Sequence, residues 1–408
     1  MEIIRFTSKK LEKIYNRAIL KNRKKIEEKV KNILNDIRLY GDEALIKYTK
    51  KFDRVKLTPR QLRVSESEIS SAYQNINPEL VSTLKIVIEN INRFYRKEIK
   101  KSWKIKDSEG IILGESYLPL ESVGIYIPAG QAPLVSTVYM AVLPAKIAGV
   151  ERIVLVSPPD QNGNVNPYIL VMANLLKVNE IYKVGGAQAI GALAFGTKTI
   201  PKVDKIVGPG NAYVTEAKRQ VYGFVDIDMV AGPTELVIIA NRFSNPKYII
   251  ADLKGQAEHA GSLPILITNS KALAKEVKMK IDSQGYIILS RNLRQAIDIA
   301  NRIAPEHLEI LVSNPKRWLR YVRNAGAVFL GPYSPVAVGD YVAGPSHVLP
   351  TNGTARFFSG LGISDFIKSM HIIGYTKKGL ERVKEPLEKI IALEGFKEHL
   401  NSVKVRFE

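Results

Sequence analysis

The stretch "EIYKVGGAQAIGALAFGT", residues 180–197, and the stretch "DKIVGPGNAYVTEAKRQ", residues 204–220, share one pattern. Each begins with a short run rich in apolar and β-branched residues, passes through a glycine-rich turn and ends in a segment with helical spacing. A strand, a tight turn and a helix in this order form the repeating unit of α/β folds with parallel strands. We therefore predict a parallel sheet covered by helices in this part of the chain.

Short apolar runs continue the alternation on both sides of these two units. "VGIYI" and "RIVLVSP" precede them, "ELVIIA" and "PILIT" follow them, and the first hundred residues have mainly helical spacing. Strands that are buried on both faces have continuous apolar runs of this kind. The predicted fold class is α/β, with two doubly wound, incomplete Rossmann-like lobes and helical N-terminal and C-terminal extensions. We expect the ligand site where the carboxyl ends of the strands face each other.

Composition narrows the classes of protein and the chemistry. The chain has 408 residues, a net charge of +20 and no cysteine, so it is long enough for two or more domains. A disulfide framework and a thiolate nucleophile are excluded, and a metal would need His, carboxylate or amide ligands. The basic residues lie at helical spacing beside glutamates, which favours a solvated surface over a nucleic-acid site. No secretory signal or membrane segment is evident, so we expect a cytoplasmic protein.

The glycine-rich turns suit phosphate groups, because the free N–H groups at a helix start face an anion. However, the dinucleotide fingerprint GxGxxG is absent, and "GPGNAY" has Tyr213 where the third glycine belongs. "GALAFGTK" has Thr197 before Lys198, the reverse of the order in a phosphate-binding P-loop. Each turn alone is better explained as a plain connection from strand to helix, and a nucleotide bound in another mode stays open.

A glutamate and a histidine stand side by side in "NRIAPEHLEILV". Pro305 interrupts a predicted helix just before Glu306 and His307, and adjacent residues act on one substrate only where the backbone is irregular. Histidine titrates near neutral pH, and a neighbouring carboxylate could activate a second proton acceptor or a water. The alternative is a surface glutamate beside a half-buried structural histidine.

Four of the five histidines lie beside carboxylates or amides, in the segments "GQAEH", "APEH", "GDYVAGPSH" and "EGFKEH". Residues three apart share one face of a helix, as the glutamine and histidine of "QAEH" would. A zinc ion with two imidazoles, one amide and one carboxylate would keep a positive charge and act as a Lewis acid. Ordinary solvated polar faces are the alternative. The candidate ligands are Gln256, His259, Asp340 and His399.

Taken together and in order, these segments resemble the histidinol dehydrogenase family. The similarity includes "GDEALIKYTKKFD", "GGAQAIGALAFGT", "KIVGPGNAYVTEAKR", "QAEH", "APEHLEI", "GDYVAGPSHVLPT", "TARFFSGL" and "EGFKEH". The resemblance implies an enzyme that oxidises L-histidinol through L-histidinal to L-histidine with two NAD⁺, in the last steps of histidine biosynthesis. It also implies one Zn²⁺ per subunit, which binds substrate without changing redox state, and a homodimer with shared active sites. Nucleic acid and membrane are not implied as partners.

The same resemblance assigns roles to individual residues. It makes Gln256, His259, Asp340 and His399 the zinc ligands. It makes His307 the acceptor of the alcohol proton and Glu306 the base that activates water on the aldehyde. The NAD⁺ contacts are Tyr126, Gln188 and Asn211. The substrate-binding set is Thr234, Gln256, His259, His307, Asp340, His347, Glu394 and His399.

The sequence departs from the usual family pattern in three places near these residues. Thr234 stands where the family commonly has serine, so the hydroxyl is kept and a methyl group is added. Ser346 replaces a common asparagine beside His347. The loop "AGSLPI" after His259 is shorter than usual, which affects the expected loop geometry rather than the identity of the ligands.

The expected division of the chain combines the alternation with the resemblance. Residues 1–22 form an N-terminal helical extension, and 23–125 together with 234–361 form the α/β lobe with the zinc and catalytic residues. Residues 126–233 form the lobe with the NAD⁺ contacts. Residues 362–408 form a C-terminal tail that contributes to the active site of the partner subunit.

Residue chemistry alone leaves three classes of function open. The first is a metal-assisted dehydrogenase of a small polar alcohol, and the second is a zinc hydrolase in which Glu306 activates water without a nucleotide. The third is a basic nucleic-acid-binding protein, favoured only by the net charge. Formation of NADH separates the first two classes.

Overall fold

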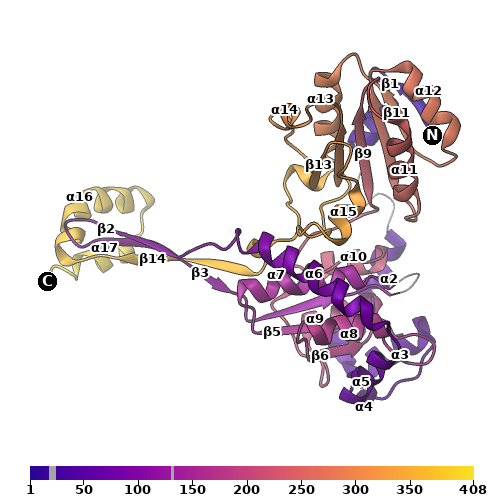
Figure 1. The fold of residues 1–408 in the computed structure, drawn as a ribbon. Coiled ribbons are helices and arrows are strands. Elements are labelled where there is room, and N and C mark those ends of the chain that lie inside the picture. Colours follow the sequence, from indigo (N-terminus) through magenta and orange to yellow (C-terminus); the bar gives the residue numbers. More distant parts are fainter. Residues whose placement is uncertain (18–23, 130–132) are drawn as a thin grey trace. The chain divides into compact units, whose positions relative to one another are not determined.

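The computed structural model describes residues 1–17, 24–129 and 133–408 (Figure 1). Contacts within the chain define two compact units, Met1–Glu98 with Leu120–Phe366, and Ile99–Pro119 with Ile367–Glu408. The first unit contains two parallel sheets flanked by helices, which confirms the predicted fold class. Over the described residues, no helix combines the length and the apolar composition that crossing a membrane requires.

The six-stranded lobe is built on one parallel sheet. The chain runs outward from β9 through β10 to β11, returns to pair β12 with β9, and continues to β13, which is the doubly wound order. In spatial order the strands are β1 (Glu2–Arg5), β11 (Tyr286–Leu289), β10 (Leu263–Thr268), β9 (Glu235–Ala240), β12 (His307–Leu311) and β13 (Ala327–Leu330). The helices of this lobe are α1 (Lys10–Tyr15), α11 (Pro246–Ala257), α12 (Lys271–Lys280), α13 (Leu293–Ile303), α14 (Lys316–Leu319) and α15 (Val336–Tyr341).

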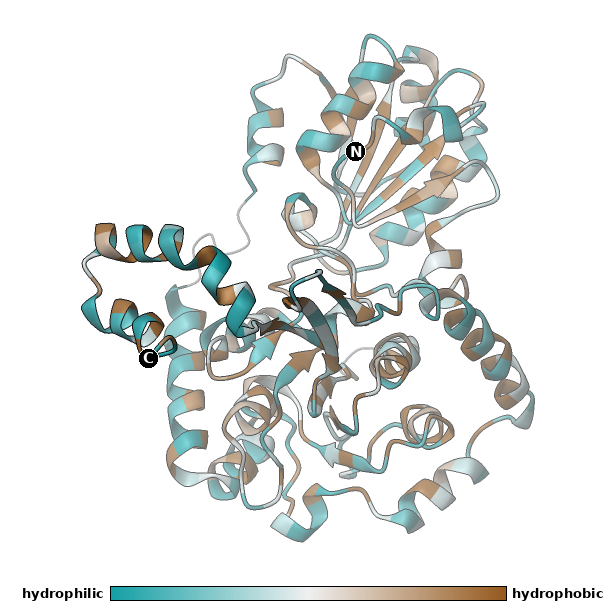
Figure 2. Cartoon of the chain, turned by 90° about the vertical axis from the view of Figure 1, so that its left-hand side faces the viewer, coloured by the Kyte–Doolittle hydropathy of each residue, from teal (hydrophilic) through white to brown (hydrophobic). Residues whose placement is uncertain are grey.

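Strand β9 shows why this sheet is buried on both faces. Its side chains alternate, so that Val237 and Ile239 belong to one core with α1 and α13, while Leu236 and Ile238 belong to another with α11 and α12. In Figure 2 the central strands are brown, whereas teal residues lie on the outer faces of the helices. The continuous apolar run "ELVIIA" is therefore explained by two covered faces.

The five-stranded lobe repeats this topology. The chain goes from β4 to β5 and β6, then returns to pair β7 with β4 and adds β8. In spatial order the strands are β6 (Glu180–Lys183), β5 (Arg152–Ser157), β4 (Ser122–Tyr126), β7 (Lys205–Val207) and β8 (Asp226–Ile227). Its helices are α2 (Lys24–Tyr40), α3 (Asp42–Phe52), α4 (Pro59–Leu62), α5 (Glu66–Gln74), α6 (Pro78–Tyr95), α7 (Val135–Ala148), α8 (Pro167–Leu175), α9 (Gly186–Phe195) and α10 (Ala212–Val221).

The packing of the early helices differs from the expected grouping of 23–125 with 234–361. The apolar face of α2, including Val30 and Leu34, shares a core with Tyr126 and Ile190 of the five-stranded lobe. Helical periodicity showed that α2 has a buried face, but it contained no information on which sheet covers that face. The structure also differs from the expected helical extension over residues 1–22, because β1 is a strand that pairs with β11 in the six-stranded sheet. Residues 18–22 lie outside the described residues.

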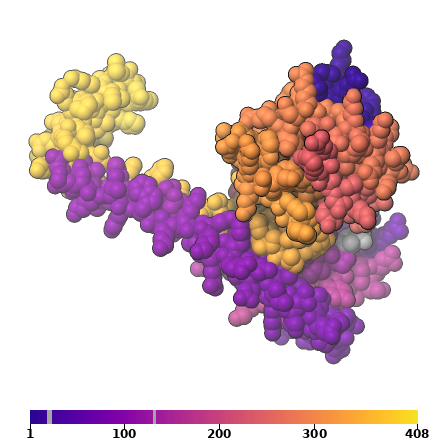
Figure 3. All heavy atoms as spheres, turned by 45° about the horizontal axis from the view of Figure 1, so that its top comes forward, coloured from indigo at the N-terminus to yellow at the C-terminus, as the bar shows by residue number. Residues whose placement is uncertain are grey.

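The second compact unit combines two distant parts of the chain. Strands β2 (Trp103–Lys106), β3 (Ile112–Pro119) and β14 (Ile367–Gly374) form an antiparallel sheet in the order β14-β3-β2. Helices α16 (Lys377–Glu394) and α17 (Lys397–Lys404) complete it, and Figure 3 shows their yellow atoms packed together. The expected tail 362–408 thus has a partner segment, 99–119, that the sequence analysis had placed in a lobe.

Candidate active site

Glu306 and His307 lie where α13 gives way to β12. The helix ends at Ile303, Ala304 adopts a left-handed φ of 50°, and Pro305 follows. His307 is the first residue of β12, which pairs with β9 and β13. The abrupt change from helix to strand provides the irregular backbone that two adjacent residues need to face one place.

Glu306 is buried and held by two donors. Its Oε2 accepts hydrogen bonds from the hydroxyl of Thr234 at 2.5 Å and from the backbone N–H of Glu235 at 2.9 Å. Burial raises the pKa of this carboxyl, although the charge of His307 and the two hydrogen bonds oppose the increase. The site therefore contains a carboxylate that is oriented and more basic than an exposed glutamate.

The orientation of His307 is fixed through its Nδ1. This nitrogen lies 3.1 Å from the carbonyl oxygen of Glu235, and because a carbonyl only accepts, Nδ1 is the donor. In the neutral ring, Nε2 is then the basic nitrogen. It is buried and lies 3.4 Å from Asp340 Oδ1 without a hydrogen bond of good geometry. Burial alone lowers the pKa of His307, but the charges of Glu306 and Asp340 outweigh it and raise the pKa to about 9.

Asp340 and His347 are joined in the segment after β13. Asp340 belongs to α15, and its carbonyl oxygen accepts a hydrogen bond from Nδ1 of His347 at 2.9 Å. The other ring nitrogen of His347 lies 3.1 Å from the hydroxyl of Thr137 in α7 of the five-stranded lobe. Burial lowers the pKa of His347, so the ring is neutral near pH 7.

Gln256 reaches the same group of residues through Thr234. It is buried in the last turn of α11, and its Nε2 donates to the Thr234 hydroxyl at 3.1 Å. The amide oxygen, the atom that binds metals, is not the atom used in this contact. His259 follows the end of α11 and is exposed.

The remaining predicted ligands belong to the second compact unit. Glu394 is the last residue of α16, His399 lies in α17, and both side chains are exposed. The His399 ring packs beside Phe396, with 5.1 Å between the ring centroids. In the described part of the chain, no group of three or more His, Asp or Glu side chains is arranged to hold a metal. The four-ligand zinc set remains a prediction.

The predicted NAD⁺ contacts occupy the carboxyl edge of the five-stranded sheet. Tyr126 ends β4, and its hydroxyl accepts a hydrogen bond from the N–H of Gly186 at 3.1 Å. Gln188 is buried at the start of α9, and its Oε1 has no hydrogen-bond partner among the described residues. Asn211 caps α10 by accepting from Tyr213 and Val214, so its side chain also has a structural role. A Cβ on Gly208 would lie 2.3 Å from the carbonyl oxygen of Tyr126, which explains the glycine in this turn.

Comparison with known proteins decides the family. The sequence model of the histidinol dehydrogenase family matches residues 16–407. Histidinol dehydrogenase of Caldanaerobacter subterraneus subsp. tengcongensis is 49% identical to this chain, and the alignment covers 97% of this chain and 95% of that relative. Histidinol dehydrogenase of Clostridium acetobutylicum is 47% identical, and the alignment covers 95% of this chain and 94% of that relative. A crystal structure of histidinol dehydrogenase from Elizabethkingia anophelis superposes with a TM-score of 0.94 at 38% identity, covering 100% of this chain and 98% of that one. The chain belongs to the histidinol dehydrogenase family.

Membership of the histidinol dehydrogenase family places the chain among the oxidoreductases. The candidate residues, however, do not all lie at the carboxyl edge of a sheet, where doubly wound folds usually bind ligands. The group around His307 lies at the amino edge of the six-stranded sheet, because Glu235 and His307 are the first residues of β9 and β12. The expectation that strand carboxyl ends face the ligand therefore needs correction for this lobe. The left-handed conformation of Ala304 and the proline after it turn the chain from α13 into β12, so that Glu306 and His307 lie at this amino edge.

Sequence reasoning missed three buried charged pairs around these sites. Arg17 pairs with Glu235, and Lys218 pairs with Asp228 under the Gly208 turn, where Lys218 also donates to the Gly208 carbonyl at 2.9 Å. Ions are rarely buried without a partner, so a charged residue inside an apolar run was the available signal. Glu309 in "EHLEILV" is such a residue.

Glu309 forms the third pair with Asp252, and here both partners are acidic. Burial and the neighbouring Asp252 raise the pKa of Glu309 to about 8, and burial also raises the pKa of Asp252. Two adjacent carboxyls in this setting share one proton. Glu309 Oε1 accepts from the N–H of Val336 at 3.0 Å, so the pair connects α11, which contains Gln256, with α15, which contains Asp340.

Proposed function

We propose that this protein oxidises L-histidinol to L-histidine through L-histidinal, with the reduction of two NAD⁺, in the final steps of histidine biosynthesis. The observation that supports this most directly is the buried pair of Glu306 and His307, held by one residue, Glu235. Two proton acceptors at one place suit a reaction with two oxidations and one hydration. The similarity to histidinol dehydrogenases over nearly the whole chain supports the substrate.

In the first step, the neutral ring of His307, which forms as the pH rises through its pKa of about 9, accepts the hydroxyl proton of the alcohol at Nε2. The donation from Nδ1 to the Glu235 carbonyl keeps that acceptor nitrogen directed away from the backbone. Bound NAD⁺ would supply the acceptor for the hydride that leaves the carbon as the C=O bond forms. The products are histidinal, NADH and one proton, and the charge of Asp340 beside Nε2 stabilises the imidazolium that results.

In the second step, Glu306 removes a proton from water as its oxygen adds to the aldehyde. Hydration gives a geminal diol, and loss of a hydride to the second NAD⁺ together with two protons from this diol gives the carboxylate. Thr234 and the N–H of Glu235 orient the carboxylate of Glu306 for this role. Its raised pKa makes it a better base than an exposed glutamate.

Zinc would be held by Gln256, His259, Asp340 and, from a second copy of the chain, His399. The donor set fits, because one carboxylate and three neutral ligands leave the ion a positive charge that can bind an amino alcohol. The pairing of Gln256 Nε2 with Thr234 leaves the amide oxygen available as the ligand atom. Bound zinc would supply Lewis acidity at the substrate and would not change its redox state.

Substrate and dinucleotide would meet near His347, which links the two lobes. Thr234, His347 and Glu394 would bind histidinol together with the zinc ligands and His307. Tyr126, Gln188 and Asn211 would contact NAD⁺, and the Oε1 of Gln188, which has no hydrogen-bond partner within the described part of the chain, is an acceptor available for this contact. We place the reaction in the cytoplasm.

The functional assembly would be a homodimer with shared active sites. The second compact unit exposes many large apolar side chains for its size, which is unusual for a surface that stays in water. They include Trp103, Ile105, Met370, Ile373, Ile390, Leu393 and Phe396. If Glu394 and His399 complete the site of the other copy, a monomer is inactive. Activity measured across a dilution series, with mass determined by light scattering, tests this, and a fully active monomer would contradict it.

A further inference from the structure

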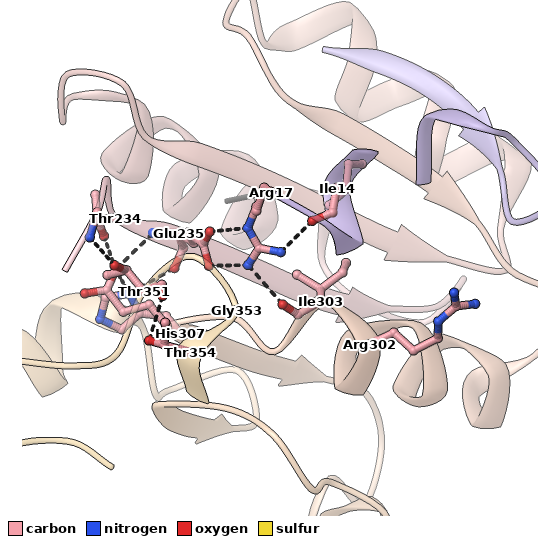
Figure 4. A network of polar contacts seen from close by, with 12 residues as sticks. Ile14, Arg17, Thr234, Glu235, Arg302, Ile303, His307, Thr351, Gly353 and Thr354 are labelled. Atoms are coloured by element: carbon pink, nitrogen blue, oxygen red, sulfur yellow. Dashed lines mark hydrogen bonds and ion pairs between the residues drawn. The ribbon is translucent and has the colours of Figure 1, made fainter. Parts of the chain in front are cut away.

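Arg17 makes a buried, two-pronged contact with Glu235. Its Nε lies 2.5 Å from Glu235 Oε1, and one terminal nitrogen lies 2.6 Å from Oε2 (Figure 4). The side chain of Arg17 is 13% exposed and that of Glu235 is 1% exposed. A planar guanidinium that binds both oxygens of a carboxylate fixes the direction of that carboxylate as well as its charge.

Glu235 is also the residue whose main chain holds both proposed proton acceptors. Its N–H donates to Glu306 Oε2 at 2.9 Å, and its carbonyl accepts from His307 Nδ1 at 3.1 Å. A change in the position of this one peptide segment would therefore move the carboxylate of Glu306 and turn the ring of His307 together.

Arg17 also contacts α1 and the chain segment that leads to Glu306. Its terminal nitrogens donate to the carbonyls of Ile14 at 2.7 Å and of Ile303 at 2.9 Å. Ile303 ends α13, three residues before Glu306. One guanidinium thus ties the start of β9 to the end of α13, and these are the two segments that set the position of Glu306 and His307.

We propose that Arg17 is a positioning residue for the Glu306–His307 pair and that it acts through the side chain of Glu235. The inference rests on the proposed function, because it assumes that the pair transfers protons. Arg17 itself would not touch the substrate. Its effect would be confined to the rate of the chemical steps, since misplacement of reacting groups by about 1 Å is enough to cost about 100-fold in rate.

A purely structural ion pair predicts something different. Loss of a general packing contact would lower stability, zinc content and substrate affinity along with the rate. Loss of a positioning contact lowers kcat while KM for histidinol and the zinc content stay nearly constant. The separation of kcat from KM therefore distinguishes the two roles.

The experiment compares Arg17→Met, which removes the guanidinium and its two-pronged contact, with Arg17→Lys, which keeps the positive charge. The matched control is Arg302→Gln, because Arg302 binds Glu12 at 3.0 Å and so also connects α13 with α1, but both side chains are 60% exposed and Glu235 is not involved. Each purified full-length variant is loaded with zinc, and its metal content, melting temperature, kcat and KM for histidinol are measured.

We expect Arg17→Met to lower kcat about 10- to 100-fold with KM changed by about twofold or less. Arg17→Lys should recover part of kcat, because the charge is kept but the second hydrogen bond is lost. Arg302→Gln should match the wild type. Where Arg17→Met does not fold, Arg17→Met combined with Glu235→Gln removes the unpaired buried charge, and we expect the same low kcat in that variant.

Two results would overturn the inference alone. One is a wild-type kcat in Arg17→Met or in the double variant, and the other is a parallel loss of kcat, zinc and affinity that Arg17→Lys does not restore. A wild-type protein that forms no NADH from histidinol would instead overturn the proposed function, and the inference with it.

Discussion

Replacement of Glu306 by glutamine separates the two oxidations. Glu306→Gln keeps an amide oxygen that can accept from Thr234 and from the N–H of Glu235, so the side chain should stay where the carboxylate is. What is lost is the ability to take a proton from water. Oxidation of histidinal needs that proton transfer because the aldehyde must first be hydrated, whereas oxidation of histidinol uses His307, and not Glu306, as the proton acceptor.

The size of the effect follows from the role. A general base contributes about 10²- to 10⁴-fold to a rate, and each factor of ten corresponds to about 1.4 kcal/mol of barrier. We therefore expect Glu306→Gln to lower histidinal oxidation by about 100-fold or more, and histidinol oxidation by much less. Because burial raises the pKa of Glu306, wild-type histidinal oxidation should increase as this carboxyl loses its proton, and the variant should lack that increase.

The assay starts separate reactions from histidinol and from histidinal and follows NADH by absorbance. The variant should release close to one NADH for each histidinol consumed and should accumulate histidinal. Glu276→Gln serves as the control, because Glu276 is a half-buried residue of α12 whose one ion pair among the described residues is with Lys280. A Glu306→Gln protein that oxidises histidinal at the wild-type rate would refute the role given to this carboxyl.

Two further substitutions test the metal site and the buried acid pair. His259→Asn should lower zinc content and activity together, as measured by metal analysis and NADH formation; full zinc occupancy in that variant would remove His259 from the ligand set. Glu309→Gln should stabilise the fold near pH 7 by on the order of 2 kcal/mol. The folded protein holds a proton on Glu309 up to about pH 8, while the unfolded chain loses it near pH 4.5, so wild-type stability falls with rising pH between these values. Denaturant unfolding at several pH values measures this, and equal pH slopes in both proteins would contradict it.

Local patterns predicted the repeating strand–turn–helix units, because the signals for them lie within single segments. "EIYKVGG" became β6 and its turn, and "ELVIIA" became β9 with both faces covered. The position of α2 was not predictable in this way, since an amphipathic helix shows that it has a partner without showing which one.

The residue types of the candidate site could be predicted from the sequence, but the contacts that hold these residues in place could not. Glu306 and His307 stood out because a proline and a helical segment preceded them. The two-pronged contact between Arg17 and Glu235 joins residues 218 positions apart, and nothing in the local sequence of either residue indicates the other. The location at the amino edge also depends on the left-handed conformation of Ala304. Alanine rarely adopts a positive φ, so the sequence does not predict this conformation.

The central claim is that two proton acceptors and one zinc ion convert an amino alcohol to an acid in two oxidations. The most direct measurement is the NADH formed per histidinol at completion, paired with the zinc content of the same sample. We predict two NADH per histidinol, loss of activity after zinc is removed by a chelator, and recovery when zinc is returned. A stoichiometry of one, or full activity in protein shown to lack divalent metal, would contradict the account.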